Sequence, residues 1–367
     1  MNNKKIIIAG GTGFIGQGLI KYFGKTNNII VLSRQSSQGH GNLYSEKLIS
    51  DRDGFNVRYI KWNGETIEES WVKEIDGADL VINLAGKSVN CRYHRKQKQQ
   101  IFSSRTNPTK AIGKAIKKAI LPPKVWINAA SATIYKNTFD QPNGEANGAI
   151  SDWKNDNMPY NVIDQLRYQK NKILARFLHG KDSSAYKDLD LDFSVQVCKV
   201  WEKTFFEEDT PLTRKIALRA AITLGAGGVL IPYLNLCKFG LGGRHGSGKQ
   251  LFSWIHIEDV ARMIEWLFEH EEAKGIYNCV APDAVPNLIL MKKLREKTGN
   301  RVGLPSPALL LEAGAFLIGT ETELILKSRW VRASKAMSEG FEFKYITLDS
   351  ALNNIISSIP RKQYHLF

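Results

Sequence analysis

The residues with the clearest chemical meaning form a glycine-rich turn near the N-terminus. An apolar run, Lys5–Ala9, leads directly into GGTGFIG. Gly10 permits a tight turn, Gly13 lets the backbone approach a pyrophosphate, and Gly16 lets the following helix pack closely on the strand. The first amides of that helix, together with its positive dipole end, favour an anion. The turn therefore predicts a dinucleotide site built from Gly10, Thr12, Gly13, Phe14, Ile15 and Gly16.

The next apolar run ends in Ser33 and Arg34, and this ending indicates which dinucleotide is bound. A site for NAD usually places an Asp or Glu here to hold the ribose 2′-hydroxyl. The chain has no carboxylate before Glu46. Arg34 can instead clasp a 2′-phosphate with two hydrogen bonds, and the Ser33 hydroxyl can add a donor. We predict NADP(H) rather than NAD(H), with a solvent-facing Arg34 as the alternative.

Short β-rich runs alternate with helix-length segments, which predicts an α/β Rossmann fold with a doubly wound parallel sheet. The runs are continuously apolar, as in strands that are covered on both faces. The expected strands are Lys5–Ala9, Ile29–Ser33, Val57–Lys61, Leu80–Leu84, Val125–Ala129 and Ile216–Leu224. The expected helices include Gly13–Phe23, Pro108–Ala119 and Val195–Phe206.

Two regions interrupt this alternation. Residues 147–192 are polar and rich in Asn, Asp and Lys, and we interpret them as an insertion. From residue 282 the chain becomes α-rich and is punctuated by proline. We therefore predict a Rossmann domain over residues 1–281 and a smaller, α-rich C-terminal substrate lobe over residues 282–367.

Composition limits the class of protein. Hydrophobic residues make up 43% of the 367 residues and charged residues 24%, as in ordinary globular proteins. The four cysteines are far apart, without a C-x-x-C pair or histidines at metal-ligand spacing, so we expect a reduced compartment and no metal. No signal-peptide pattern or bilayer-length apolar run occurs. We expect a cytoplasmic protein that binds a small molecule and no membrane, and a homodimer stays open.

The formal net charge is +15, from 51 basic and 36 acidic residues. No acidic residue occurs between Asp79 and Asp140, a gap that contains CRYHRKQKQQ and KAIGKAIKKAI. A basic surface can bind nucleic acid, with an affinity that falls steeply with salt. The stretch has little aromatic interleaving, so we favour a solvated helix face and a site for a small polyanionic ligand.

Several segments together resemble one protein family. GGTGFIG, NLAG at Asn83–Gly86 and SATIY at Ser131–Tyr135 resemble the extended short-chain dehydrogenase/reductase superfamily. More narrowly, the chain resembles its atypical epimerase-like branch, which ends in a C-terminal domain of unknown function. That resemblance rests on VNCRY, PPKVWINAASATIY, TRKIALR, GLGGRHGSGKQLFSWIHIEDV and TETELILKSR.

The resemblance implies further residues at the cofactor. Three residues after the fourth strand should line it: Leu84, Ala85 and Gly86. Asn63 stands where relatives often place an Asp near the adenine. Arg105 stands where they carry a catalytic-site Asn, and it could reach a cofactor phosphate or the substrate. Thr223 stands where the backbone contacts the nicotinamide side.

The resemblance also implies a serine and a Tyr-x-x-x-Lys pair at the reacting centre, in which the lysine lowers the tyrosine pKa. Ser131 matches the serine. Counting back from Glu202 puts Ser194 and Cys198 where Tyr and Lys belong, so the pair is absent. We name Ser131 and Tyr135 as catalytic candidates, with a wall of the site as the alternative role for Tyr135.

Other candidates carry competing interpretations. The Tyr168–Lys172 segment spells Tyr-x-x-x-Lys within the polar insertion, where we take it as coincidence. Arg92 and Tyr93 are polar candidates near Ser131 and could equally be surface residues. His256 could titrate near neutrality, although a structural role before a helix is favoured. Lys327, Ser328 and Arg329 either cap the small lobe or face an anionic substrate.

These observations predict an NADP(H)-binding oxidoreductase or epimerase-like enzyme that acts on an unidentified small molecule, with a sugar nucleotide as one candidate. A missing general acid typically costs about 10²–10⁴-fold in rate. The alternative is therefore a catalytically degenerate NADP(H)-binding sensor or scaffold protein.

Overall fold

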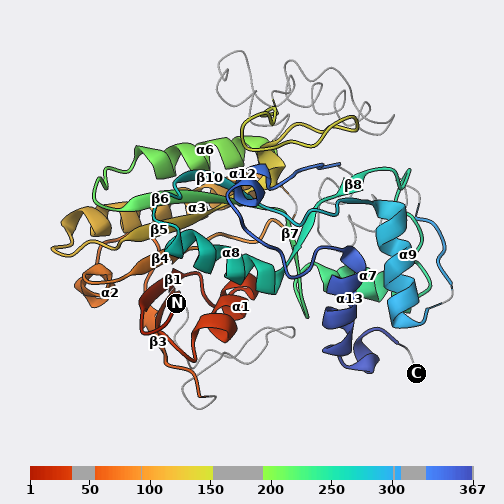
Figure 1. The fold of residues 1–367 in the computed structure, drawn as a ribbon, viewed down its shortest axis with the longest axis horizontal. Coiled ribbons are helices and arrows are strands. Elements are labelled where there is room, and N and C mark those ends of the chain that lie inside the picture. Colours follow the sequence, from red (N-terminus) through yellow and green to blue (C-terminus); the bar gives the residue numbers. More distant parts are fainter. Residues whose placement is uncertain (35–53, 92, 152–192, 301, 307–327, 366–367) are drawn as a thin grey trace.

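The computed structural model describes residues 1–34, 54–91, 93–151, 193–300, 302–306 and 328–365 (Figure 1). Within these ranges seven parallel strands form one sheet in the order β10-β6-β5-β4-β1-β2-β3. The strands are β1 (Lys5–Ala9), β2 (Asn28–Ser33), β3 (Val57–Lys61), β4 (Leu80–Asn83), β5 (Val125–Ser131), β6 (Arg214–Ala220) and β10 (Gly275–Cys279). The predicted Rossmann fold is confirmed.

Helices cover both faces of this sheet (Figure 1). Because successive strand residues point to opposite faces, β1 sends Ile6 and Ile8 into one core and Ile7 and Ala9 into the other. The first core is closed by α1 (Phe14–Phe23) and α8 (Ile257–Glu269). The opposite core contains residues of α2 (Glu69–Ile75), α3 (Arg95–Lys118) and α6 (Phe193–Glu207). The continuous apolar runs of the sequence follow from burial on both faces.

A third apolar core, the helical core, lies beside the sheet, around three helices at one end of the molecule (Figure 1). These helices are α7 (Leu230–Lys238), α9 (Asn287–Thr298) and α13 (Leu348–Ser357). Two small sheets adjoin them: β7 (Ile222–Leu224) with β9 (Trp254–His256), and β8 (Leu251–Phe252) with β11 (Val285–Pro286). Since α7 precedes residue 282, the helical core draws on both sides of the predicted domain boundary, which stays a prediction.

The chain passes between the main sheet and the helical core several times. It leaves the sheet at β6 for α7, returns at α8 and β10, and enters the helical core again at α9. After residue 328 it packs Ala333, Ala336 and Phe341 against the sheet core, and α12 (Ser334–Ser338) lies in this stretch. It then ends in the helical core with α13 and a short 3-10 turn, η3 (Arg361–Gln363).

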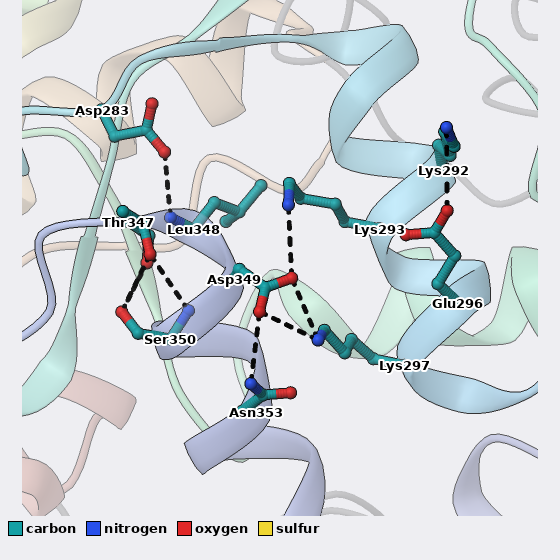
Figure 2. A network of polar contacts seen from close by, with 10 residues as sticks. All are labelled: Asp283, Lys292, Lys293, Glu296, Lys297, Thr347, Leu348, Asp349, Ser350 and Asn353. Atoms are coloured by element: carbon teal, nitrogen blue, oxygen red, sulfur yellow. Dashed lines mark hydrogen bonds and ion pairs between the residues drawn. The ribbon is translucent and has the colours of Figure 1, made fainter.

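Polar contacts join α9 to α13 (Figure 2). Asp349 accepts from Lys293 Nζ at 3.2 Å and from Lys297 Nζ at 3.0 Å. Asp283 accepts the backbone N–H of Leu348 at 3.1 Å, and Thr347 caps α13 by accepting the N–H of Ser350. The Asp349 carboxylate is partly exposed, so each such pair contributes less than about 1 kcal/mol. The buried apolar core supplies most of the stability of this lobe.

Three elements differ from the sequence predictions. The helix expected over Pro108–Ala119 begins at Arg95, and Pro108 lies inside it. The single strand expected over Ile216–Leu224 is two strands, β6 and β7, which belong to different sheets. The strand β10, at the edge of the main sheet, was not predicted. Among the described helices, none has the length and apolar character needed to cross a bilayer.

Candidate functional site

The glycine turn lies at the carboxyl end of β1, between β2 and β4, where the strand order reverses. In open α/β sheets this crevice is where ligands bind. Gly10 has a φ of 77°, and a Cβ there would lie 2.9 Å from the Leu84 carbonyl carbon. A Cβ at Gly16 would lie 2.4 Å from the Gly11 backbone. The glycines are therefore required by close backbone approach.

The start of α1 keeps its amides available for an anion. Gly13 is the N-cap, no side chain caps the helix, and its first turn contains no acidic residue. The first N–H groups of a helix have no acceptor within it, so they point toward any ligand at that end. Gln17 holds the turn from within the helix, since its Nε2 donates to the Gly11 carbonyl at 2.8 Å. This geometry fits a bound pyrophosphate.

The predicted NLAG contacts lie against the same turn. Asn83 Nδ2 donates to Asn128 Oδ1 at 2.7 Å, and Asn83 Oδ1 accepts the N–H of Ala85 at 3.1 Å. This buried amide therefore fixes the path of the backbone, so that Leu84 lies against Gly10. Gly86 is exposed at the mouth of the crevice. Sequence reasoning named the residues at the surface of this turn and missed the asparagine that shapes it.

An open pocket of about 700 Å³ adjoins the end of β2. It is lined by Arg34, Ile60, Lys61, Trp62, Asn63, Glu68 and Ser70. Arg34 is exposed, and Ser33 beside it is buried. One pocket thus contains Arg34, which is predicted to bind the 2′-phosphate, and Asn63, which is predicted to contact the adenine.

The side chain of Asn63 is already engaged in its own turn. Its Oδ1 accepts the N–H groups of Glu65 at 2.8 Å and Thr66 at 2.9 Å. Its Nδ2 donates to Thr66 Oγ1 at 2.6 Å. These bonds account for the asparagine without a ligand, and its role at the adenine stays a prediction.

Ser131 ends β5, at the same carboxyl edge of the sheet as the glycine turn. Its Oγ accepts the N–H of Thr133 at 3.2 Å and donates to Thr133 Oγ1 at 3.0 Å, which starts the 3-10 turn η2 (Ala132–Ile134). Cys198 on α6 packs against Ala132 and Ile134 of the turn that follows Ser131, and burial raises the pKa of its thiol to about 12. Cys198 therefore occupies the position beside the serine that the sequence count assigned to the missing lysine, and it is neutral.

Arg105 brings a positive charge to this neutral pair. It comes from α3, its Nη1 donates to the Ile101 carbonyl at 2.9 Å, and its guanidinium lies 5.2 Å from the centre of the Trp201 ring. Burial lowers its pKa, while the nearby Cys198 acts in the opposite direction. A Cβ at Gly86 would lie 3.4 Å from the guanidinium carbon, so Arg105 lies against the backbone that follows β4.

Tyr135 is fully buried and belongs to a separate polar network. Its hydroxyl donates to Asn278 Oδ1 at 2.9 Å and accepts from Arg219 Nη1 at 2.8 Å. Arg219 in turn makes two bonds to Glu202, at 2.8 and 2.7 Å. The catalytic role of Tyr135 stays a prediction, and these contacts already explain the residue as a structural one.

Two family models match the chain. One describes the NAD dependent epimerase/dehydratase family and matches residues 6–168, and the other describes a domain of unknown function, DUF1731, and matches residues 306–355. Through these two matches the chain is similar to proteins of this epimerase family. The epimerase family protein YfhF of Bacillus subtilis (strain 168) is 29% identical over 352 residues, which cover 96% of this chain and 98% of YfhF.

Solved structures share the fold of this chain. The human epimerase family protein SDR39U1 (isoform 2), solved with NADPH, is 23% identical with a TM-score of 0.71, over 96% of this chain and 99% of that one. The UDP-N-acetylglucosamine 4-epimerase of Methanobrevibacter ruminantium M1, solved with UDP-N-acetylmuramic acid, is 15% identical with a TM-score of 0.66, over 97% and 98% of the two chains.

Thr223 lies on β7, buried, opposite Ile255 of β9. Its Oγ1 has no hydrogen-bond partner among the described residues. The next turn holds Gly225 and Gly228 against the Phe14 ring, where a Cβ on Gly225 would come within 2.8 Å. The glycines of this second turn make room for Phe14 at the start of α1. The sequence analysis did not name them, although the GAGG segment at residues 225–228 indicates such a turn.

His256 is the N-cap of α8, and its Nδ1 accepts the N–H of Glu258 at 3.1 Å. Its ring lies 3.8 Å, centre to centre, from that of Tyr345, and burial lowers its pKa to about 4. These contacts agree with the favoured structural interpretation. The candidates Arg92, Tyr168–Lys172 and Lys327 lie outside the described residues.

Proposed function

We propose that this protein is an NADP(H)-dependent enzyme of the oxidoreductase or epimerase-like type, acting in the cytoplasm on a small molecule. Two neighbouring features carry the cofactor proposal. The glycine turn follows β1, and the exposed Arg34 lines the pocket at the end of the adjacent strand, β2. The ligands of two proteins with the same fold support the proposal. SDR39U1 was solved with NADPH and the Methanobrevibacter epimerase with a sugar nucleotide, which makes sugar nucleotides the first substrates to test.

The chain's own residues divide the work. The amides at Gly13 and the start of α1 would hold the pyrophosphate, and Arg34 with Ser33 would hold the 2′-phosphate. When bound, the nicotinamide would supply or accept a hydride. Ser131 would donate a hydrogen bond to the substrate oxygen, and the charge of Arg105 would stabilise negative charge that develops there.

A titration of the purified protein with NADPH and with NADH tests the cofactor proposal. We expect Arg34→Ala to weaken NADPH binding by about 1.5–3 kcal/mol, the range for hydrogen bonds to charged groups, and to leave NADH binding nearly unchanged. Arg58→Ala is the matched control, because Arg58 is an exposed arginine on β3 that pairs with Glu74 at 2.9 Å. Equal affinity of wild type and Arg34→Ala for NADPH would remove the preference for NADP(H).

A second candidate function is a cofactor-binding sensor or scaffold without turnover. The observation that favours it is Cys198, a neutral thiol beside Ser131 where the lysine charge is expected. A screen of sugar nucleotides and small carbonyl compounds for NADPH turnover separates the two candidates. Turnover that Ser131→Ala abolishes without loss of NADPH affinity would support the enzyme. No turnover with any compound in the screen would support the sensor.

A further inference from the structure

Three polar side chains are enclosed between α3 and the main sheet: Asn83, Thr109 and Asn128, each at most 1% exposed. Asn83 is the last residue of β4 and pairs in register with Asn128 of β5, while Thr109 lies in the interior of α3. The side chains around them on this face are apolar. Because a buried polar group is costly unless it is hydrogen-bonded, the bonds of this trio decide what it does.

Hydrogen bonds connect the three side chains to one another and to α3. Asn83 Nδ2 donates to Asn128 Oδ1 at 2.7 Å and to Thr109 Oγ1 at 3.2 Å. The Thr109 hydroxyl donates its own hydrogen to the Arg105 carbonyl at 2.7 Å. A hydroxyl has one hydrogen, so Thr109 can meet Asn83 only as an acceptor. Within the trio, Thr109 is the residue that joins the sheet to α3.

These bonds fix the orientation of the Asn83 amide. Its Oδ1 accepts the N–H of Ala85 at 3.1 Å, and Leu84, between the two, lies against the glycine turn. An asparagine amide can exchange its oxygen and nitrogen by rotation, and the groups around it decide which orientation is stable. Thr109 and Asn128 both present acceptor oxygens to the Asn83 nitrogen, so they keep its oxygen directed at the Ala85 N–H.

The same turn of α3 also contacts the loop that follows β3. Pro108 Cγ lies 3.3 Å from the position that a Cβ at Gly64 would occupy. Asn107 Nδ2 donates to Glu65 Oε1 at 3.0 Å. Gly64 and Glu65 belong to the turn that begins at Asn63, which lines the pocket at the end of β2. The middle of α3 therefore contacts both the backbone after β4 and the turn after β3.

We propose that Thr109 is a positioning residue for the dinucleotide: its hydroxyl holds the Asn83 amide in place and so presents the backbone of residues 84–86 to the cofactor. The inference rests on the proposed function and adds a residue that acts through Asn83. Thr109→Val preserves the shape of the side chain and removes the acceptor, which leaves one Asn83 hydrogen buried without a partner. Rotation of the amide then becomes more favourable, and Ala85 loses its acceptor.

Titration of the purified protein with NADPH tests the proposal. Thr109→Val should weaken NADPH binding by about tenfold, within the cost of one unpaired buried donor, and Thr109→Ser, which keeps the hydroxyl, should restore it. Thr298→Val is the matched control, because Thr298 is 2% exposed on α9, donates to the Leu294 carbonyl at 2.8 Å and accepts from Asn300 Nδ2 at 2.9 Å. It should lower the melting temperature as Thr109→Val does and keep the wild-type NADPH affinity. Unchanged affinity in Thr109→Val, or an equal loss in Thr298→Val, would overturn the proposal.

Hydrogen exchange of the Ala85 amide, measured without NADPH, separates this inference from the proposed function. In Thr109→Val the Ala85 N–H should exchange about tenfold faster than in wild type, because its acceptor is no longer held, and in Thr298→Val it should exchange at the wild-type rate. If wild type does not bind NADPH while Ala85 responds in this way, the proposed cofactor fails and the positioning role of Thr109 stands. An Ala85 exchange rate that Thr109→Val leaves unchanged would show that Thr109 does not position this backbone.

Discussion

The proposed cofactor site and the proposed reacting centre of this molecule are built by different means. At the cofactor end, consecutive glycines bring backbone amides to one point, and a single nearby arginine adds charge. At the proposed reacting centre, Ser131 of β5, Cys198 of α6 and Arg105 of α3 come from three separate segments, which approach one another only in the folded chain. A site made of contiguous backbone tolerates few substitutions of its glycines, whereas a site made of distant side chains can change its chemistry and leave the fold intact.

The largest expected effect would break the scaffold of the reacting centre. Glu202→Gln leaves the buried Arg219 guanidinium without its anionic partner, and we expect a loss of about 3–5 kcal/mol in the free energy of unfolding. Urea denaturation measures it. Asp349→Asn, which removes a partly exposed carboxylate between Lys293 and Lys297, should cost less than about 1 kcal/mol. Similar losses in the two variants would contradict this ranking.

A smaller effect is expected on turnover, and it should distinguish the role of Ser131 from that of the nearby Tyr135. We expect Ser131→Ala to lower turnover about 100-fold, or about 2.7 kcal/mol, and to leave NADPH affinity unchanged. Tyr135→Phe should keep most of the turnover and lose about 1 kcal/mol of stability, because its hydroxyl bonds only Arg219 and Asn278 among the described side chains. Steady-state kinetics and urea denaturation of both variants test the contrast. A larger kinetic effect at Tyr135 would restore it as the catalytic group.

The smallest effect concerns two helices that begin differently, α1 without a side-chain cap and α8 with His256 as its cap. The pKa of His256 falls from 6.5 to about 4 on burial, so the unfolded chain takes up this proton first as the pH falls. Its contribution to stability is complete above pH 6.5 and is lost on the way down to pH 4. We expect a loss of about 2 kcal/mol between pH 7.5 and pH 5 from this residue.

His256→Asn tests the pH dependence, because asparagine can cap α8 and does not titrate. Urea denaturation at pH 7.5 and pH 5 should show a smaller difference in this variant than in wild type. Part of the difference should persist, since burial also lowers the pKa of His245 to about 4. The control is His94→Asn, because His94 is exposed at the start of α3 and its side chain makes no capping bond. This variant should show the same difference between the two pH values as wild type.

More of the proposed cofactor site than of the proposed reacting centre could be predicted from the sequence, and the reason is physical. The glycine spacing and the Ser33–Arg34 ending are local, so they could be interpreted without the fold. Pro108 misled the prediction of α3, because a proline usually starts a helix and here lies in its interior. The approach of Arg105 on α3 to Trp201 on α6 and to Gly86 depends on long-range packing, which spacing along the chain does not encode.

The repeated passage of the chain between the sheet core and the helical core has a consequence for how the substrate enters. Several strands and connections join the two bodies, so a single bending point cannot swing them apart. Adjustment would have to spread over β7, β9 and the segment that carries Arg329. Under the proposed enzyme function, a substrate would enter through rotation of side chains and small shifts of these segments, while the sheet and the helical core keep a nearly constant separation.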